Sequence, residues 1–401
     1  MKLLYIATSF PEPHKGATIY TDLAEALYEA GHKITVAVSE QPKNLSQTTL
    51  KKERGFDVLR IVTGNYYDVS LIEKGITTLM IPIKMRQGIS KYLGNEEFDF
   101  VLYEAPPVTN AKLVSWAKKK FKCPSYLMLK DIFPQNAVDI GMIKKNGLLY
   151  KFFLRKEKQL YDSASVIGCM SEANRKYILE HNAFINPNKV ELFPNTKKLT
   201  DKYISEEYTM RQQYSIPNDA CVFLFGGNMG KPQYVDLLCN ALVECKDDKS
   251  VFFLFVGRGT ERHKLEKTIK NYDIKNALLL ENLPRDMYEQ ITKECDVGLI
   301  VLHPDFTIPN YPSRILSYLE YAKPVLAATD KMTDIKALIE EIDCGEWTWS
   351  GDLDSFVEKI KKMANSNNLS ERGLKGRDYI ENNLTVPQSV ALLEKHFNKE
   401  L

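Results

Sequence analysis

The stretch FLFGGNMGKPQYVDLL, residues 223–238, joins an apolar run to a glycine-rich turn and then to an amphipathic segment. Three consecutive apolar residues followed by two glycines indicate a buried strand that ends in a tight turn. A strand, a turn and a helix in this order form the repeating unit of a parallel α/β sheet. The stretch lies past the middle of a 401-residue chain. A chain of this length exceeds one hydrophobic core, so we predict that another domain precedes it.

The same alternation runs through both halves of the chain. In the first half, the strand-like runs are KLLYIAT, KITVAVS, FDFVLYE and PSYLMLK, with helix-like segments such as YTDLAEALYEAG between them. In the second half, they are ACVFLFGG, SVFFLFVG, ALLLENL, DVGLIVL and PVLAAT. Strands that alternate with helices predict parallel sheets with crossover helices. We therefore predict an α/β fold of two doubly wound, Rossmann-like domains.

The boundary between the domains is expected in FPNTKKLTDKYISEEY, residues 193–208, where the periodicity lapses and polar residues gather. We assign residues 1–198 to the first domain and 199–384 to the second. The last segment, 385–401, has a helical period and follows the second sheet. We expect it to pack back on the first domain.

Charge and cysteine content narrow the class of protein. Residues 1–195 carry 27 lysines and arginines against 20 acidic residues, and the remaining residues carry 27 against 32, so the halves are expected to meet different partners. The seven cysteines form no C-x-x-C pair and lie largely in apolar runs, which favours buried thiols in a reduced cytosol over disulfides or zinc. No apolar run approaches the roughly 20 residues of a spanning helix, and the first residues resemble a buried strand rather than a signal peptide. A cytoplasmic protein is expected.

The GGNMGK turn has two interpretations. A Walker A loop is disfavoured, because Phe225 stands where its first glycine belongs and Pro232 follows Lys231. The G-x-G-x-x-G pattern of dinucleotide sites is also absent there. The turn is either a simple strand-to-helix connection or a backbone cradle with a lysine at a helix N-terminus, which suits a diphosphate.

The positions that follow the predicted strands carry further candidates, because ligands of open α/β sheets bind outside the carboxyl ends of the strands. In the second half these ends carry glycine, amide or basic residues, namely Gly227, Asn228, Lys231, Gly257, Asn282, Arg285 and the segment from His303. Four such strand ends are difficult to explain by packing alone. In the first half the rule selects Gly16, Glu104 and Asp131. The two carboxylates either face a cleft or serve as helix caps and lysine partners.

The ordered set SFPEPHKGATIYTDLAEALYEAGHKITVAV, LKDIFPQNAVDIG, VELFPNT, FGGNMGKPQ, FVGRGTERHKLE, NLPRDMYEQITKECDVGLIVL and YPSRILSYLEYAKPVLA resembles the GT-B glycosyltransferases of family 4. Within them it is most similar to the bacterial branch that builds capsule and O-antigen repeat units, including N-acetylfucosamine transferases. The resemblance covers nearly the whole chain. It implies a UDP-sugar donor on the second domain, an acceptor on the first, an interdomain cleft, and no required metal or other cofactor.

Carried over by position, the resemblance implies roles for individual residues. The turn at Gly227 and Lys231 would hold the diphosphate, Asn282, Leu283 and Arg285 would line the base, and Ser313 and Arg314 would open a helix that faces ribose and phosphate. Lys231, Arg314 and Glu104 are the catalytic candidates. The donor-binding set is completed by Gly16, Asn228, Gly257, Ser317 and Glu320, and His14, Lys130 and Asp131 are assigned to the acceptor side.

The sequence departs from the family pattern at important places. Asn228 and Gln233 stand where an arginine and a lysine are usual, and Pro309 and Ser317 replace a pair of glutamates. Ser317 or Glu320 would then contact the ribose. Three functions therefore stay open. They are transfer of an N-acetylated amino-deoxy sugar to a polyprenyl-diphosphate-linked saccharide, 2-epimerisation of a UDP-sugar, and non-catalytic binding of a sugar nucleotide.

The stretch IKKNGLLYKFFLRKEKQLY, residues 143–161, mixes six basic residues with one acidic residue and many apolar ones. Such a segment is typical either of a helix on an anionic membrane surface or of a core-facing helix with a solvated side. Peripheral attachment to the inner face of the cell membrane is expected from the first alternative. No nucleic-acid-binding pattern accompanies the charge, so nucleic acid is not an expected partner.

Overall fold

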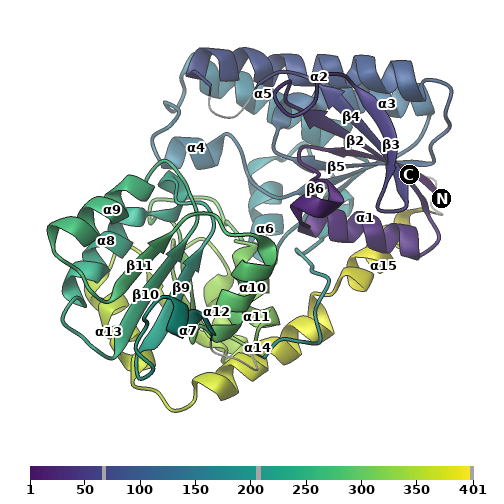
Figure 1. Cartoon of the computed structure of the whole chain (residues 1–401). Coiled ribbons are helices and arrows are strands. Elements are labelled where there is room, and N and C mark those ends of the chain that lie inside the picture. Colours follow the sequence, from purple (N-terminus) through teal and green to yellow (C-terminus); the bar gives the residue numbers. More distant parts are fainter. Residues whose placement is uncertain (66–68, 205–208, 398–401) are drawn as a thin grey trace. The chain divides into compact units, whose positions relative to one another are not determined.

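The computed structural model describes residues 1–65, 69–204 and 209–397, and the chain divides into two compact units (Figure 1). The first unit comprises Met1–Lys198 and Val386–Leu401, and the second comprises Leu199–Thr385. Each unit has its own sheet and its own core. The predicted fold class, two doubly wound α/β domains, is confirmed.

The first unit is built on an eight-stranded sheet of order β3-β4-β2-β1-β5-β6-β7-β8. The strands are β1 (Lys2–Ala7), β2 (Lys33–Glu40), β3 (Thr49–Glu53), β4 (Phe56–Val62), β5 (Phe100–Ala105), β6 (Ser125–Leu129), β7 (Val166–Cys169) and β8 (Val190–Leu192). All neighbours are parallel except β3 and β4. The strand order reverses between β1 and β5, which makes their carboxyl ends the expected place for a ligand.

The antiparallel pair β3 and β4 is a hairpin that the sequence analysis did not identify. The two turn residues, Arg54 and Gly55, have φ angles of 52° and 91°, as two-residue hairpins require. Strand β3 is largely exposed, so its sequence TLKKE carries little apolar signal. The Arg54 guanidinium donates to Glu25 and to the Gly16 carbonyl oxygen, which ties the hairpin to the loop after β1.

The helices of the first unit are α1 (Ile19–Glu29), α2 (Leu71–Leu93), α3 (Ala111–Phe121), α4 (Gln135–Asp139), α5 (Leu148–Ser163), α6 (Glu172–His181) and α15 (Val386–Phe397), with short 3-10 turns η1 (Pro13–Lys15), η2 (Val108–Asn110) and η3 (Pro187–Lys189). Helix α15 comes from the C-terminal end of the chain. Its apolar side, with Val390 and Leu393, joins the core around β1 and β2. Ser389 also hydrogen-bonds Thr196 over 2.8 Å.

The second unit has a six-stranded parallel sheet of order β11-β10-β9-β12-β13-β14, which reverses between β9 and β12. Its elements are α7 (Thr209–Gln213), β9 (Cys221–Gly226), η4 (Lys231–Gln233), α8 (Val235–Glu244), β10 (Val251–Val256), α9 (Arg262–Asn271), β11 (Ala277–Leu280), α10 (Arg285–Glu294), β12 (Val297–Val301), α11 (Arg314–Glu320), β13 (Val325–Thr329), α12 (Ile335–Ile342), β14 (Gly345–Trp349), α13 (Leu353–Ala364) and α14 (Leu369–Asn383). The stretch 223–238 thus contains the first strand of this sheet and the crossover to its first long helix.

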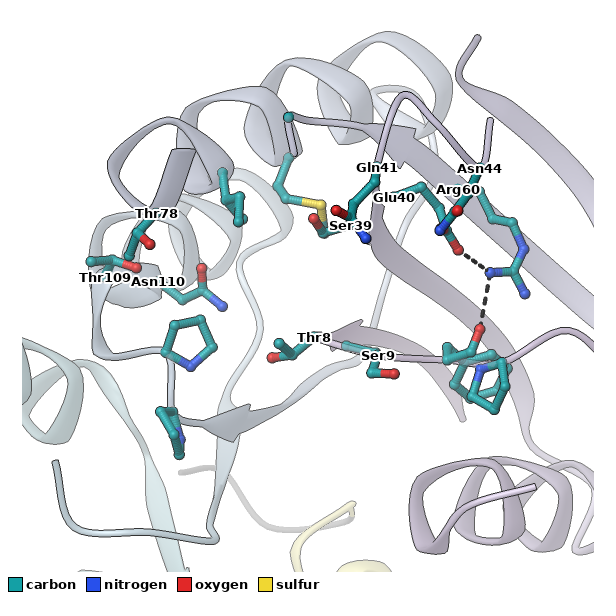
Figure 2. A pocket seen from close by; sticks show the side chains of 18 of the residues that line it. Thr8, Ser9, Ser39, Glu40, Gln41, Asn44, Arg60, Thr78, Thr109 and Asn110 are labelled. Atoms are coloured by element: carbon teal, nitrogen blue, oxygen red, sulfur yellow. Dashed lines mark hydrogen bonds and ion pairs between the residues drawn. The ribbon is translucent and has the colours of Figure 1, made fainter. Parts of the chain in front are cut away.

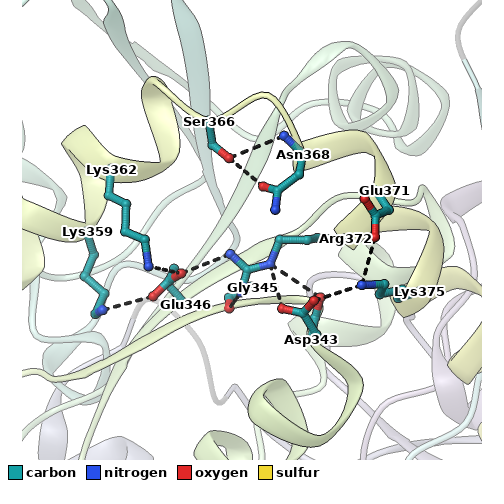
Figure 3. A network of polar contacts seen from close by, with 10 residues as sticks. All are labelled: Asp343, Gly345, Glu346, Lys359, Lys362, Ser366, Asn368, Glu371, Arg372 and Lys375. Carbon is teal, nitrogen blue, oxygen red and sulfur yellow. Dashed lines mark hydrogen bonds and ion pairs between the residues drawn. The ribbon is translucent and has the colours of Figure 1, made fainter.

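A network of charged side chains fixes the last strand of the second unit (Figure 3). The Glu346 carboxylate on β14 accepts hydrogen bonds from Lys359 and Lys362 of α13, at 2.9 and 2.8 Å, and from Arg372 of α14 at 3.0 Å. Burial opposes the charge of Glu346, but these three cations outweigh it and lower its pKa to about 2. One carboxylate therefore links three elements that are distant in the sequence.

All seven cysteines are buried and none forms a disulfide, as the sequence predicted for small core residues. Among residues 1–65, 69–204 and 209–397, no helix is long and apolar enough to cross a membrane.

Candidate functional site

The stretch after β9 makes a close backbone turn at the carboxyl edge of the second sheet. Gly227 has a φ of 111°, which is accessible to glycine and strained for other residues. A Cβ atom on Gly226 would lie 1.9 Å from the Tyr288 hydroxyl, so a side chain is excluded there. The glycines of this turn are therefore required by space as well as by conformation.

The loop after β10 packs directly against this turn. Gly257 has a φ of 142°, and a Cβ atom on it would lie 2.0 Å from the Gly227 carbonyl oxygen. Further along, Met229 donates its N–H to the Arg258 carbonyl oxygen over 2.9 Å, and its own carbonyl oxygen accepts from Glu261. The loops at two neighbouring strand ends thus form one continuous backbone surface.

Arg314, the first residue of α11, extends over this surface. Its guanidinium carbon lies 4.2 Å from the centre of the Phe225 ring. A Cβ atom on Gly227 would be 3.2 Å from Arg314 Nη2, so the cation lies beside the glycine turn. Stacking on an aromatic ring holds a planar guanidinium without using up its donors. The structure therefore brings together Gly227, Gly257 and Arg314 among the predicted donor-site residues.

Lys231 was expected at a helix N-terminus, and the structure places it at the start of a short 3-10 turn. It begins the short turn η4 and is exposed, whereas α8 begins only at Val235, after Tyr234 in a left-handed conformation. The Gln233 side-chain oxygen accepts from the Gly230 N–H at 3.2 Å and from the Asn228 amide at 3.3 Å. Asn228 and Gln233, which stand where the family pattern has an arginine and a lysine, therefore shape the turn around Lys231.

The other strand ends contribute loops to the same edge of the sheet. His303, after β12, donates its N–H to the Pro232 carbonyl oxygen over 2.9 Å. Asn282 is exposed and Leu283 is half-buried after β11, and Arg285 opens α10 with an ion pair to Glu289. Ser313 precedes α11 and is exposed.

Glu320 does not join the cluster around Arg314. It lies at the opposite end of α11, is buried, and accepts a hydrogen bond from the Thr200 N–H over 3.1 Å. The expectation that it reaches a bound ribose is therefore corrected, because its carboxylate holds the segment that enters the second unit. Ser317 is half-buried in the middle of the same helix.

In the first unit, Glu104 is enclosed rather than open to a cleft. Its side chain is 3% exposed, and its oxygens accept from the Tyr5 hydroxyl at 2.8 Å and from the Thr8 N–H at 2.6 Å. Burial raises the pKa of Glu104 to about 7. The carboxylate thus fixes the loop after β1 to the end of β5, which makes Glu104 a positioning residue.

Lys130 and Asp131, after β6, also have partners inside the first unit. Lys130 donates to the Asn195 side-chain oxygen over 2.7 Å, and burial lowers its pKa to about 7. Asp131 accepts from the Ile132 N–H and from Asn136 of α4, at 2.8 and 2.6 Å, and burial raises its pKa to about 6. Asp131 therefore does not cap α4, whose N-cap is Pro134, but is held by a neighbouring backbone N–H and by a side chain of that helix, whereas Lys130 pairs with an amide.

His14 and Gly16 lie in the loop between β1 and α1. His14 is exposed in η1 beside Glu12, with 3.7 Å between Nε2 and Oε2. Gly16 has a φ of 112° with no atom near its Cβ position, so the turn requires glycine for conformation alone.

A pocket of about 350 Å³ opens next to this loop, and the sequence analysis did not identify it (Figure 2). Its walls come from the ends of β1, β2 and β5, from Arg60 on β4, and from α2 and η2. The polar side chains shown in Figure 2 include Thr8, Ser9, Ser39, Gln41, Thr78, Thr109 and Asn110. The signal in the sequence was the position of APPVTN directly after a predicted strand. Within the described parts of the chain, no group of three or more histidine, cysteine or acidic residues could hold a metal ion.

Comparisons with known proteins agree with this architecture. Residues 206–376 match the family model described as Glycosyl transferases group 1. A probable glycosyltransferase, WbjE of Pseudomonas aeruginosa, is 25% identical over 234 residues, which cover 55% of this chain and 54% of WbjE. The matched stretch thus spans about half of that relative.

Solved structures resemble the chain over its whole length. Sucrose-phosphate synthase from Thermosynechococcus elongatus has a TM-score of 0.76 at 14% identity, covering 99% of this chain and 98% of that one. HepE from Anabaena, in complex with UDP, has a TM-score of 0.70 at 16% identity, covering 99% of both chains. Residues 206–376 are therefore similar to the group 1 glycosyltransferases, and the whole chain shares the two-domain α/β fold of these solved structures.

Proposed function

We propose that the protein transfers a sugar from a UDP-linked donor, held by the second unit, to a saccharide held by the first. The observation that carries this proposal is the position of Arg314 beside the Gly227 turn at the β9 strand end. A backbone surface with an adjacent fixed cation suits a diphosphate, which carries its charge on oxygens that accept from N–H groups. The complex of HepE with UDP supports a nucleotide on this fold.

In the transfer, a hydroxyl oxygen of the acceptor forms a bond to the anomeric carbon, and the bond from that carbon to the UDP oxygen breaks. The acceptor hydroxyl gives up its proton, to the departing phosphate oxygen or to water. The electron pair leaves with UDP, so negative charge develops on the phosphate next to the sugar. Arg314 and Lys231 are the cations assigned to stabilise this charge. Arg314 is preorganised by its contact with Phe225, whereas Lys231 is exposed and approaches from η4.

We assign an N-acetylated amino-deoxy sugar as the transferred group and a polyprenyl-diphosphate-linked saccharide as the acceptor. The sequence resemblance to the capsule and O-antigen branch supports both assignments. The name of WbjE as a probable glycosyltransferase agrees with the reaction class.

A lipid-linked acceptor requires access to a membrane, and the first unit has a surface of suitable chemistry. Helix α5 exposes Leu148, which is 90% accessible, with Leu149 and Phe152 beside it. On helix α2, four exposed apolar side chains lie on one side of the helix, namely Ile76, Leu79, Met80 and Ile83. Basic residues of both helices, including Lys84, Arg86, Lys151 and Arg155, are exposed as well. We propose that these helices attach the protein to the anionic cytoplasmic face of the cell membrane.

The test of the reaction uses purified full-length protein, a panel of UDP-sugars, and a lipid-linked saccharide that is present or absent. Release of UDP that depends on the acceptor is the expected result. An isomerised donor without acceptor would identify a 2-epimerase instead, and binding of UDP-sugar without turnover would identify a non-catalytic partner.

The test of membrane attachment is flotation with liposomes. We expect retention by vesicles with anionic lipid, weakened by salt, and loss of retention when Ile76, Leu79 and Ile83 are changed to serine. A matched control changes Tyr272 and Leu374, two exposed apolar residues of the second unit, to serine. Equal retention by neutral and anionic vesicles would contradict the proposal.

A further inference from the structure

In the first-unit pocket, both cationic side chains of the described lining are already paired with carboxylates. The four charged residues of this lining are Glu12, Lys15, Glu40 and Arg60, two of each sign. Lys15 donates to Glu12 over 2.8 Å. Arg60, whose side chain is 6% exposed, donates to Glu40 at 2.5 Å, to Glu53 at 2.6 and 2.8 Å, and to the Phe10 carbonyl oxygen at 2.9 Å. The only guanidinium among the described lining residues therefore has all three nitrogens engaged.

Two buried polar atoms of the lining lack a partner among the described residues. Within those parts of the chain, the Thr109 hydroxyl and the Asn110 side-chain oxygen, both in η2, make no hydrogen bond although their residues are only 7% and 5% exposed. Figure 2 shows the Asn110 amide turned towards the middle of the pocket, with Thr78 and Thr109 beside it. Buried polar atoms without partners are unfavourable, so their presence in a pocket wall points to a ligand that supplies the missing bonds.

The rest of the wall is apolar. Phe10, Ile81 and Met85 line the pocket together with Pro106 and Pro107. A ligand that fits must therefore present hydroxyl or amide groups on one side and hydrocarbon on another. It must also not be anionic, because the described lining offers no unpaired cation and the Arg60 cluster includes a second carboxylate, Glu53. A saccharide ring with an N-acetyl or deoxy substituent has this combination of surfaces.

We infer that this pocket binds a neutral saccharide ring carrying an apolar substituent, and that it discriminates against anionic sugars through the paired state of Arg60. That the pocket binds a sugar follows from its lining alone. That this sugar is the acceptor of the transfer rests on the proposed function. Thr109 and Asn110 hydrogen-bond the ring, and Ile81 and Met85 contact its substituent.

The test compares two probes of similar size, the methyl glycosides of N-acetylglucosamine and of glucuronic acid, by ligand-observed NMR titration. Binding of the neutral glycoside alone is expected. Thr109→Val removes the hydroxyl and keeps the side-chain shape, so we expect its dissociation constant for the neutral probe to rise about three- to tenfold. Its melting temperature should not fall, because the hydroxyl has no partner to lose. Asn110→Leu provides a second variant with the same expectation for binding.

Thr348→Val is the matched control, because Thr348 in the second unit is equally buried but donates to Ser355 over 2.8 Å. It should melt at a lower temperature and bind the neutral probe normally. Failure of the neutral probe to bind, equal binding of both probes, or unchanged binding by both pocket variants would overturn the inference. UDP binding is measured on the same samples, so that failure of the proposed function can be told from failure of the pocket assignment. If the wild-type protein binds the neutral sugar but not UDP, the proposed function is contradicted and the pocket assignment stands.

Discussion

Arg314 lies over the ring of Phe225, with 4.2 Å between the guanidinium carbon and the ring centre. Phe225 belongs to β9 and Arg314 opens α11, so the contact joins two elements that are almost ninety residues apart. Because Gly227 follows Phe225 closely, the same contact holds the cation next to the glycine turn. This pair links the fold of the second unit to its proposed chemistry.

Arg314→Ala should lower kcat/KM for transfer by about 10²–10³, as expected when one preorganised electrostatic group is removed. Steady-state assays of UDP release measure the change. Lys336→Ala is the control, because it removes another cation–ring contact of the second unit, 4.8 Å from the centre of Trp347. Similar losses in both variants would show that the effect comes from the fold and not from the site.

Lys231→Ala should lower kcat by about 10², since Lys231 is assigned to the charge that develops on UDP. Its exposed position predicts an unchanged melting temperature. Lys246→Ala, at another exposed lysine of the second unit, should leave kcat at the wild-type value. Wild-type turnover of the Lys231 variant would remove this residue from the mechanism.

Gly257→Ala should destabilise the second unit by about 2–4 kcal/mol, because the new methyl group would meet the Gly227 carbonyl oxygen. Denaturant unfolding measures the loss, and UDP affinity should fall with it. Gly31→Ala is the control for backbone strain alone. Gly31 also has a positive φ, 89°, but no atom near its Cβ position, so about 1–2 kcal/mol is expected. Equal costs would mean that the close approach of the two loops is unimportant.

Glu104→Gln should change how the free energy of unfolding depends on pH, because Glu104 is a buried carboxylate of the first unit. Burial raises the pKa of Glu104 from 4.5 to about 7, so the folded protein holds this proton more tightly than the unfolded chain does. The contribution of Glu104 to stability therefore falls as pH rises from about 4.5 to about 7. Glutamine stays neutral and keeps an acceptor for the Thr8 N–H. Relative to wild type, the variant should gain about 2 kcal/mol between pH 5 and pH 8 in denaturant unfolding. A constant difference across this range would contradict the assignment.

Glu346→Gln should show the opposite dependence. The folded-state pKa of Glu346 is lowered from 4.5 to about 2, so the wild-type advantage is present above about pH 4.5 and is lost as pH falls towards 2. Melting temperatures from pH 7 to pH 3 measure it. Glu371→Gln, at the exposed edge of the same network, removes a carboxylate whose ion pair is with Lys375, and it should have a much smaller effect. Parallel curves for the two variants would show that the three cations around Glu346 add nothing beyond a single surface pair.

The local sequence determined the alternation of strands and helices, because a buried parallel strand requires a continuous apolar run and its crossover helix requires an apolar side. It also indicated Gly227 and Gly257, because a turn that needs a positive φ angle after a strand favours glycine, which is recognisable in the sequence. The exposed hairpin strand β3 was missed, because its side chains carry little apolar pattern.

Only the tertiary structure decided which polar side chains work together. The Glu104 carboxylate, on β5, accepts from the Thr8 N–H and the Glu320 carboxylate, on α11, accepts from the Thr200 N–H, over sequence separations that no local pattern encodes. The sequence shows neither the pairing of Arg60 with Glu40 and Glu53 nor the Thr109 hydroxyl that lacks a partner among the described residues in the wall of the same pocket. Hydrophobic periodicity is a property of neighbouring residues, whereas the partner of a buried charge depends on which distant segments the folded sheet places beside it.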